Sequence, residues 1–243
     1  MLISFSRHWF LLALASAVMF PFPGTMMVPA QPFSTTSVIH QVDAAVKART
    51  DNVEGYSVTE HYAVYRSKDE IHPVAEMTVV TTYRKASGKS YTIVSQTGSS
   101  IVRNLVLGSI LNNEKLLNQP GTREGTWITS ANYEMTLKPG GIQRLNGRDC
   151  LVVALTPKRK APYLIEGILW VDSMDGSIVQ LEGTASKSSS VLTGPTQVTR
   201  QYVNISGFPE ATHVRAVSNS FMLGETVVKI DYQDYHIQLR PPV

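Results

Sequence analysis

The stretch "EGILWVDSMDGSIVQLEG", residues 166–183, decides the fold of this chain. It contains two runs rich in β-branched, aromatic and other apolar residues, separated by the pair Asp175-Gly176. An Asp-Gly pair between two such runs is typical of a β-hairpin with a tight turn. We therefore predict two antiparallel strands here. Nothing within the hairpin carries chemistry, so we expect it to form part of a wall.

Strand-like segments lie on both sides of this hairpin. Apolar and polar residues alternate in "GYSVTEHYAVYRS" (55–67), and they alternate again on both sides of the turn in "AEMTVVTTYRKASGKSYTIVSQTG" (75–98). This period of two is typical of strands with one apolar face. After residue 147 we predict six strands, within the ranges 148–157, 163–173, 176–186, 194–208, 210–223 and 225–239.

Two segments have helical rather than strand-like spacing. In "STTSVIHQVDAAVKART" (34–50), Val38, Val42, Val46 and Arg49 recur every three or four residues. "SSIVRNLVLGSILNNEKLLNQPG" (99–121) has a wide apolar stripe with Gly108 in its interior, which costs about 1 kcal/mol relative to Ala. A large antiparallel sheet with so few helices predicts an α+β fold.

The first thirty residues have the features of an export signal. Arg7 precedes an apolar run from Trp9 to Phe22, and Val28-Pro29-Ala30 resembles a small-residue cleavage site. We predict a signal peptide over residues 1–30, cleaved near Ala30, and a single domain over 31–243. An uncleaved membrane anchor is the alternative, but the run is shorter than the roughly 20 residues of a spanning helix.

Composition limits the classes of function that the chain can have. Removing residues 1–30 takes away one Arg and leaves 21 basic against 19 acidic residues, a balance that predicts no nucleic-acid partner. Cys150 is the single cysteine, so we expect no internal disulfide.

The sequence lacks the familiar catalytic and metal-binding motifs. It has no H-E-x-x-H and no G-x-S-x-G, and "SGKS" (87–90) lacks the first glycine of a phosphate-binding loop. We predict a protein that is not an enzyme and that holds neither metal nor cofactor. A catalytic triad assembled from distant residues is the alternative that one sequence leaves open.

The order of these segments resembles a known family. An export signal, an amphipathic helix, a strand, a hairpin, an apolar helix and then "GRDCLVVALTP" (147–157) and "LWVDSMDGSIVQLE" (169–182) are similar to the LolA/LolB-like periplasmic lipoprotein-carrier superfamily, especially its outer-membrane lipoprotein-sorting-like proteins. The resemblance implies a strongly curved antiparallel sheet, an incomplete barrel, with helices covering its concave face. It also implies a non-catalytic protein that holds acyl chains between sheet and helices.

Alternation and helical spacing select candidates for the lining of such a cavity. They are Tyr62, Val64, Met77, Val79, Tyr91, Ile93, Leu105, Ile110, Leu111, Leu169, Val171 and Ile178. Two alternatives remain open: the opposite strand face, with Ile168, Trp170 and Leu181, turns inward, or the same side chains fill a closed core.

Two functions from different classes follow. The first is a periplasmic, monomeric carrier or binding protein for lipoprotein acyl chains or another lipid, with a transient membrane-protein partner. The second is an exported protein-interaction or envelope-stress regulatory module without a ligand cavity. The best-known carriers of the family have an Arg that holds the helical lid closed, and the sequence does not assign Arg66, Arg84 or Arg103 to this role. It also lacks the N-terminal Cys of the lipid-anchored receptors, so delivery of lipoproteins does not follow from the fold.

Overall fold

The computed structural model of the protein describes residues 33–66, 68–188, 194–220 and 224–241. The predicted export signal and its cleavage point lie outside the described residues. The helical segments are α1 (Thr35–Asn52), α2 (Ser100–Val102), the π-helical turn η1 (Arg103–Leu107), α3 (Gly108–Leu117) and the 3₁₀ turn η2 (Arg123–Thr126). The strands are β1 (Val53–Arg66), β2 (Ala75–Arg84), β3 (Gly88–Gly98), β4 (Tyr133–Leu137), β5 (Gln143–Leu145), β6 (Arg148–Pro157), β7 (Ile165–Asp172), β8 (Ile178–Ala185), β9 (Gln197–Ile205), β10 (Phe208–Ser220) and β11 (Gly224–Leu239).

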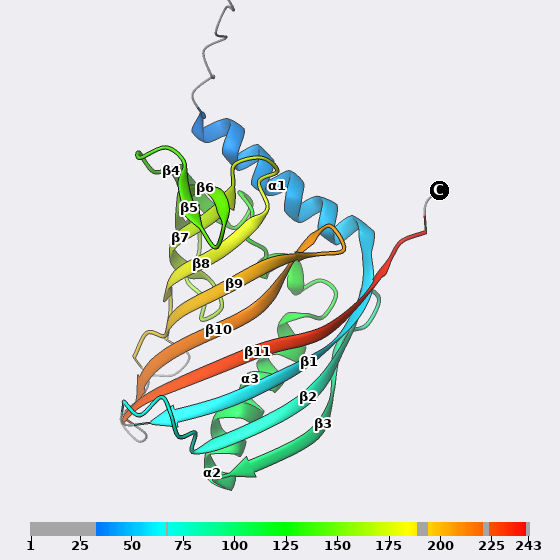
Figure 1. Cartoon of the computed structure of the whole chain (residues 1–243), viewed down its shortest axis with the longest axis vertical. Coiled ribbons are helices and arrows are strands. Elements are labelled where there is room, and N and C mark those ends of the chain that lie inside the picture. Colours follow the sequence, from blue (N-terminus) through cyan, green and yellow to red (C-terminus); the bar gives the residue numbers. More distant parts are fainter. Residues whose placement is uncertain (1–32, 67, 189–193, 221–223, 242–243) are drawn as a thin grey trace, which may run out of the picture. The chain divides into compact units, whose positions relative to one another are not determined.

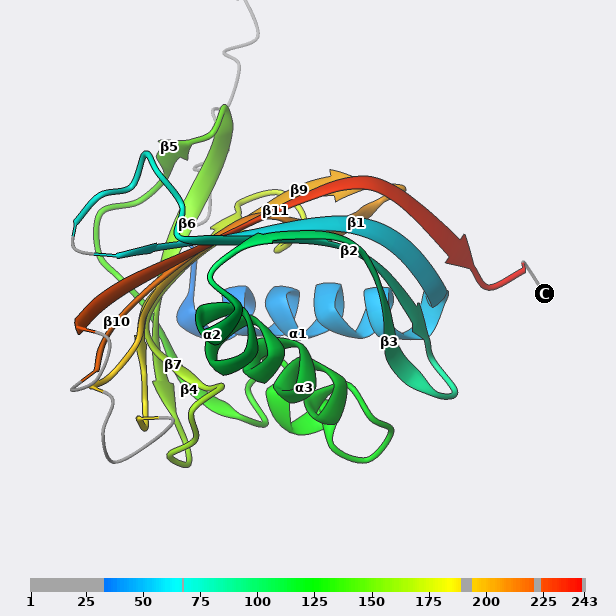
Figure 2. The same ribbon diagram turned by 90° about the horizontal axis from the view of Figure 1, so that it is seen from below.

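The strands of the described residues form one antiparallel sheet, which is seen from its broad side in Figure 1. Its order is β3-β2-β1-β11-β10-β9-β8-β7-β6-β4, and β5 pairs with β6. Within the described residues β3 and β4 are not paired with each other, so the sheet does not close into a barrel. Figure 2 shows the sheet arching over α1, α2 and α3. This arrangement confirms the predicted α+β fold with an incomplete barrel.

The hairpin predicted from residues 166–183 is present as β7 and β8. Val171 pairs with Ile178, and the turn between them contains Gly176 with a φ of 70°. Leu169, Val171 and Ile178 are buried in a core under α1. These three residues therefore lie on the strand face that packs against the helix. Leu181, which the sequence pattern places on the opposite face, is buried with them, because the register shifts by one residue between its pair with Leu169 and the pair of Val171 with Ile178.

The turn of this hairpin lies directly against α1. A Cβ atom at position 176 would lie 2.7 Å from the backbone carbonyl carbon of Gln41, closer than real Cβ contacts allow. Glycine therefore meets two requirements here, because it also adopts the left-handed backbone conformation without the cost that other residues carry.

Gly176→Ala is expected to lower the free energy of unfolding by about 2–3 kcal/mol, since it adds a backbone clash to a left-handed conformation. Gly147→Ala is the matched control, because Gly147 has a φ of 79° but open space around its Cβ position. The control is expected to cost only about 1 kcal/mol. Urea denaturation of both variants measures the difference, and equal losses would show that the contact with α1 contributes nothing.

Two buried clusters lie on the concave face of the sheet. The first joins α1 to strands β4, β6, β7 and β8 through residues such as Val38, Val42 and Leu155. The second joins α2, η1 and α3 to β1, β2, β10 and β11 through residues such as Tyr62 and Leu107. Val198 of β9 packs against both clusters.

The apolar helix predicted over residues 99–121 is interrupted. Five residues before Gly108 adopt a π-helical turn, in which the Gly108 N–H donates to the carbonyl of Arg103. Such turns are rare and often lie at functional sites. The irregular turn therefore ends at Gly108, the residue whose low helix propensity indicates a less stable point in the helix.

Two strands, β4 and β5, were not among those predicted from the sequence. β4 alternates buried and exposed residues, with Tyr133 and Met135 buried, but it has only five residues. β5 has three. Segments this short have little periodicity of their own, and both are fixed by pairing with β6.

Candidate functional site

A pocket of about 520 Å³ lies between the concave face of the sheet and the helical segments. Its lining comes from the end of α1, from α3 and η2, and from every described strand except β5 and β6. The two buried clusters contribute Tyr133, Ile165, Ile178 and Leu181 from one side and Tyr232 from the other. The pocket therefore occupies the space that the cores leave between sheet and helices.

Tyrosines form much of this lining. Tyr56 stacks on Tyr83 with ring centroids 5.1 Å apart, and Tyr232 stacks on Tyr235 at 6.5 Å. Burial raises the pKa of Tyr56, Tyr232 and Tyr235, so these phenols stay neutral. A tyrosine offers an apolar ring and a hydroxyl, and this wall therefore suits a ligand that has both apolar and polar parts.

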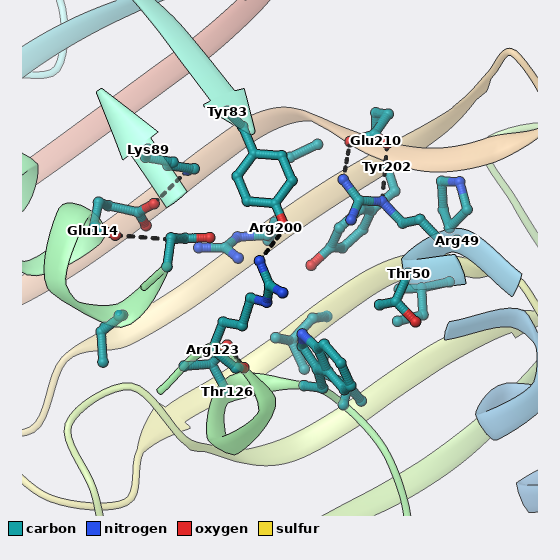
Figure 3. Close-up of a pocket in the computed structure, with 18 of the residues that line it drawn as sticks. Arg49, Thr50, Tyr83, Lys89, Glu114, Arg123, Thr126, Arg200, Tyr202 and Glu210 are labelled. Atoms are coloured by element: carbon teal, nitrogen blue, oxygen red, sulfur yellow. Dashed lines mark hydrogen bonds and ion pairs between the residues drawn. The ribbon is translucent and has the colours of Figure 1, made fainter. Parts of the chain in front are cut away.

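An ion pair holds the end of α1 to the sheet at one side of the pocket (Figure 3). Arg49 donates to both carboxylate oxygens of Glu210 of β10, from Nε at 2.9 Å and from Nη2 at 2.7 Å. Burial lowers the pKa of Arg49, but the carboxylate of Glu210 outweighs it and raises the pKa overall. The two hydrogen bonds restrict the orientation of the Arg49 side chain, and they therefore hold the end of the helix in position as well as pairing the two charges.

The helical cover is held to the sheet by two further contacts. Lys89 of β3 donates from Nζ to Glu114 of α3 at 2.6 Å, and the Lys89 side chain is only 11% exposed. Arg123 of η2 donates from Nη1 to the hydroxyl of Tyr83 at 3.0 Å and to the backbone carbonyl of Lys85. These polar contacts add to the second apolar core, which also joins α2, η1 and α3 to the sheet.

Arg200 projects into the pocket from β9 (Figure 3). Its pKa is raised, first by the neighbouring Tyr202, with which it also has a side-chain hydrogen-bond interaction, and further by the charge of Glu114, so the guanidinium remains charged. Its Nε atom is buried and has no hydrogen-bond partner among the described residues.

The residues predicted to line a cavity lie in three environments. Ile178 lines the pocket, and Leu169 and Val171 lie beside it in the core under α1. Ile93 and Leu105 are exposed, at 51% and 57%. The remaining residues belong to the second core or pack against it, and they are Tyr62, Val64, Met77, Val79, Tyr91, Ile110 and Leu111. A role for these twelve residues in ligand binding stays a prediction.

The charged residues of the pocket were not among the predicted site residues. The pocket is lined by Arg49, Arg123 and Arg200, and not by Arg66, Arg84 or Arg103, which are also among the described residues. The sequence contains a signal for two of them. Arg49 continues the apolar stripe of α1, and Arg200 stands between Val198 and Tyr202 on one strand face.

Two further observations on the described residues concern metal sites and membrane-spanning helices. No group of three or more His, Cys, Asp or Glu side chains in the described part of the chain is arranged to hold a metal ion. Among the described helices, none is long and apolar enough to cross a membrane.

Comparisons with known proteins identify structural neighbours. No family model and no curated protein matches this chain. Among solved structures, the chain is similar to a LolA superfamily protein from Nitrosomonas europaea, with a TM-score of 0.45 and 13% identity over 86% of this chain and 96% of that one. A DUF1329 family protein from Desulfovibrio piger has a TM-score of 0.43 and 14% identity over 85% and 94%. An outer membrane lipoprotein-sorting protein domain from Vibrio parahaemolyticus has a TM-score of 0.45 and 11% identity over 82% and 91%.

Proposed function

We propose that the protein is an exported, non-catalytic carrier or binding protein that holds an acyl-containing amphiphile in the pocket between sheet and helices. The observation that supports this most is the pocket itself. Its volume of about 520 Å³ falls within the range of about 300–1,000 Å³ that is usual for small-molecule sites. Its location between the curved sheet and its helical cover is where an acyl chain can be removed from water.

The lining of the pocket supports an amphipathic ligand rather than a purely apolar one. Leu181, Ile178, Val198 and Trp127 supply apolar surface, and each buried CH₂ group of an acyl chain contributes about 0.8 kcal/mol. The tyrosine hydroxyls and the charged side chains supply polar partners in the same space. Binding of this kind requires no catalytic residue.

The attachment of the cover supports a cycle of loading and release. The Lys89–Glu114 pair and the contacts of Arg123 are polar, and water can replace them, but α2, η1 and α3 also pack on the sheet through the second apolar core. Opening on the side of α3 and η2 would then also separate part of that core, with α1 remaining in place on the first core. The sequence of residues 1–30 supports a periplasmic location for this cycle.

Native mass spectrometry of the protein, produced with export and purified without detergent, tests the proposal. We expect a near-stoichiometric bound lipid or acylated peptide, either as purified or after incubation with a lipid extract. Organic extraction then identifies the ligand class. A protein that stays at its apo mass in both conditions would contradict the carrier function and favour the protein-interaction module, which crosslinking in the envelope would detect.

A further inference from the structure

Arg200 differs from the other cations of the pocket in its partners. Arg49 pairs with Glu210, Lys89 with Glu114, and Arg123 with Glu124, while Lys85 lies 3.7 Å from Glu54. No ion pair among the described residues includes Arg200. A buried charge without a counter-ion is costly, so this arrangement points to a partner that comes from outside the chain.

Most carboxylates of the pocket pair with cations other than Arg200. Glu210 takes both donors of Arg49, Glu114 takes Lys89 at 2.6 Å, and Asp51 pairs with Lys47. Glu60 accepts a hydrogen bond from the hydroxyl of Tyr62 with one oxygen, while its buried Oε1 has no hydrogen-bond partner among the described residues. Glu114 acts on Arg200 only at longer range, through its charge. None of these carboxylates therefore forms an ion pair with Arg200.

A second guanidinium points toward the same part of the pocket. Figure 3 shows Arg200, which comes from the sheet, and Arg123, which comes from the helical cover, both beside Tyr83. Arg123 uses Nη1 for Tyr83 and Lys85, and Nε for Glu124 at 3.1 Å. In the described structure no hydrogen bond uses its Nη2. Two guanidinium groups with free donors form a site for an oxyanion, because their planar forks match carboxylate and phosphate groups.

We infer that the pocket is specific for anionic amphiphiles, with Arg200 and Arg123 together binding a carboxylate or phosphate group of the ligand. The inference rests on the proposed function, and it names the class of ligand for the same site. The apolar tail extends along Ile178, Leu181 and Val198. Since Arg200 belongs to the sheet and Arg123 to the cover, the anion joins the two layers. A loaded protein is then more firmly closed than an empty one.

Isothermal titration with three probes tests the inference: palmitate, the uncharged hexadecanol, and inorganic phosphate. Palmitate is expected to bind about 10- to 100-fold more tightly than hexadecanol, the range that hydrogen bonds to charged groups supply. Arg200→Gln should remove this preference and leave the affinity for hexadecanol within about twofold. Arg200→Lys keeps the charge but not the fork and should retain part of the preference.

Arg144→Gln is the control, because it changes the net charge equally at an exposed position in β5, away from the pocket. It should bind all three probes as the unchanged protein does. Circular dichroism establishes that each variant is folded, and Arg123→Gln provides a second test from the other side of the pocket.

The outcomes separate the two proposals. Equal binding of palmitate and hexadecanol would overturn the anion site and leave the carrier function standing. Binding of neither amphiphile would overturn the carrier function. If phosphate binds as tightly as palmitate and depends on Arg200, the anion site is confirmed with a free anion as its source, and the acyl-carrier function is contradicted.

Discussion

Glu210→Gln is expected to lower the free energy of unfolding by about 3 kcal/mol, the largest loss of stability predicted for this protein. Glu210 is only 3% exposed and accepts two hydrogen bonds from Arg49. The amide can accept only one of them and carries no charge, so Arg49 would be left buried without its counter-ion. The Arg49 side chain is 27% exposed, so we expect a loss of stability at the lower end of the range for buried ion pairs.

Urea denaturation followed by circular dichroism measures this loss, and Lys47→Gln is its control. Lys47 also makes an ion pair on α1, with Asp51, but both side chains are at least half exposed. Pairs of this kind contribute about 0.2–1 kcal/mol. The double variant Arg49→Met with Glu210→Met is expected to recover most of the stability, because it leaves no buried charge unpaired. If Glu210→Gln were as mild as the control, Arg49 would not be anchoring α1.

Val198→Trp is expected to weaken ligand binding by at least about tenfold, since the indole would fill space that the ligand needs. Val198 lies on the same strand face as Arg200 and Tyr202, lines the pocket and packs against both cores. Overpacking of this position costs about 1–3 kcal/mol of stability. Native mass spectrometry and titration with palmitate measure the change in binding.

Val203→Trp is the matched control on the same strand. Val203 is 44% exposed and does not line the pocket, so the same substitution should leave binding unchanged. Leu117→Trp fills the pocket from the side of α3 and provides a second variant if Val198→Trp does not fold. Retention of ligand by folded Val198→Trp and Leu117→Trp would show that the ligand binds elsewhere.

Local patterns in the sequence predicted much of the fold. The hairpin of β7 and β8 depends on residues close in the chain, an Asp-Gly turn between two apolar runs. The amphipathic stripe of α1 likewise identified Val38 and Val42 as buried. The π-helical turn before Gly108 was not predicted, because helical spacing in the sequence does not distinguish a π-helical turn from an α-helical one; Leu107 within the turn is fully buried.

The sequence predicted less of the candidate site than of the fold. Alternation indicates which side chains lie on the inner face of a strand, but it does not indicate what covers them. Tyr62 and Val79 lie on that face under the helices, whereas Tyr56 and Tyr232 reach the pocket. The difference depends on where α1, α3 and η2 cross the sheet, which is set by contacts such as Arg49 with Glu210 across 161 residues.

A charged residue within an apolar pattern was the signal available for the pocket. Arg200 lies on the inner face of β9, between Val198 and Tyr202, and Arg49 lies at the end of the apolar stripe of α1. Each position is unfavourable for a charge unless a partner is present. For Arg49 the partner is in the chain, and for Arg200 we propose that it is the ligand.

The pairing of β1 with β11 has a consequence for how the protein is made. Val53 lies opposite Leu239 in this ladder, so the first and last of the described strands are neighbours in the sheet. β3-β2-β1 and the strands from β10 to β4 remain separate until β11 pairs with both β1 and β10. Until then β1 and β10 each present an unpaired edge, which is a template for aggregation. The 16 residues of β11 therefore join two half-sheets, and the sheet that carries the pocket is continuous only when β11 has paired on both sides.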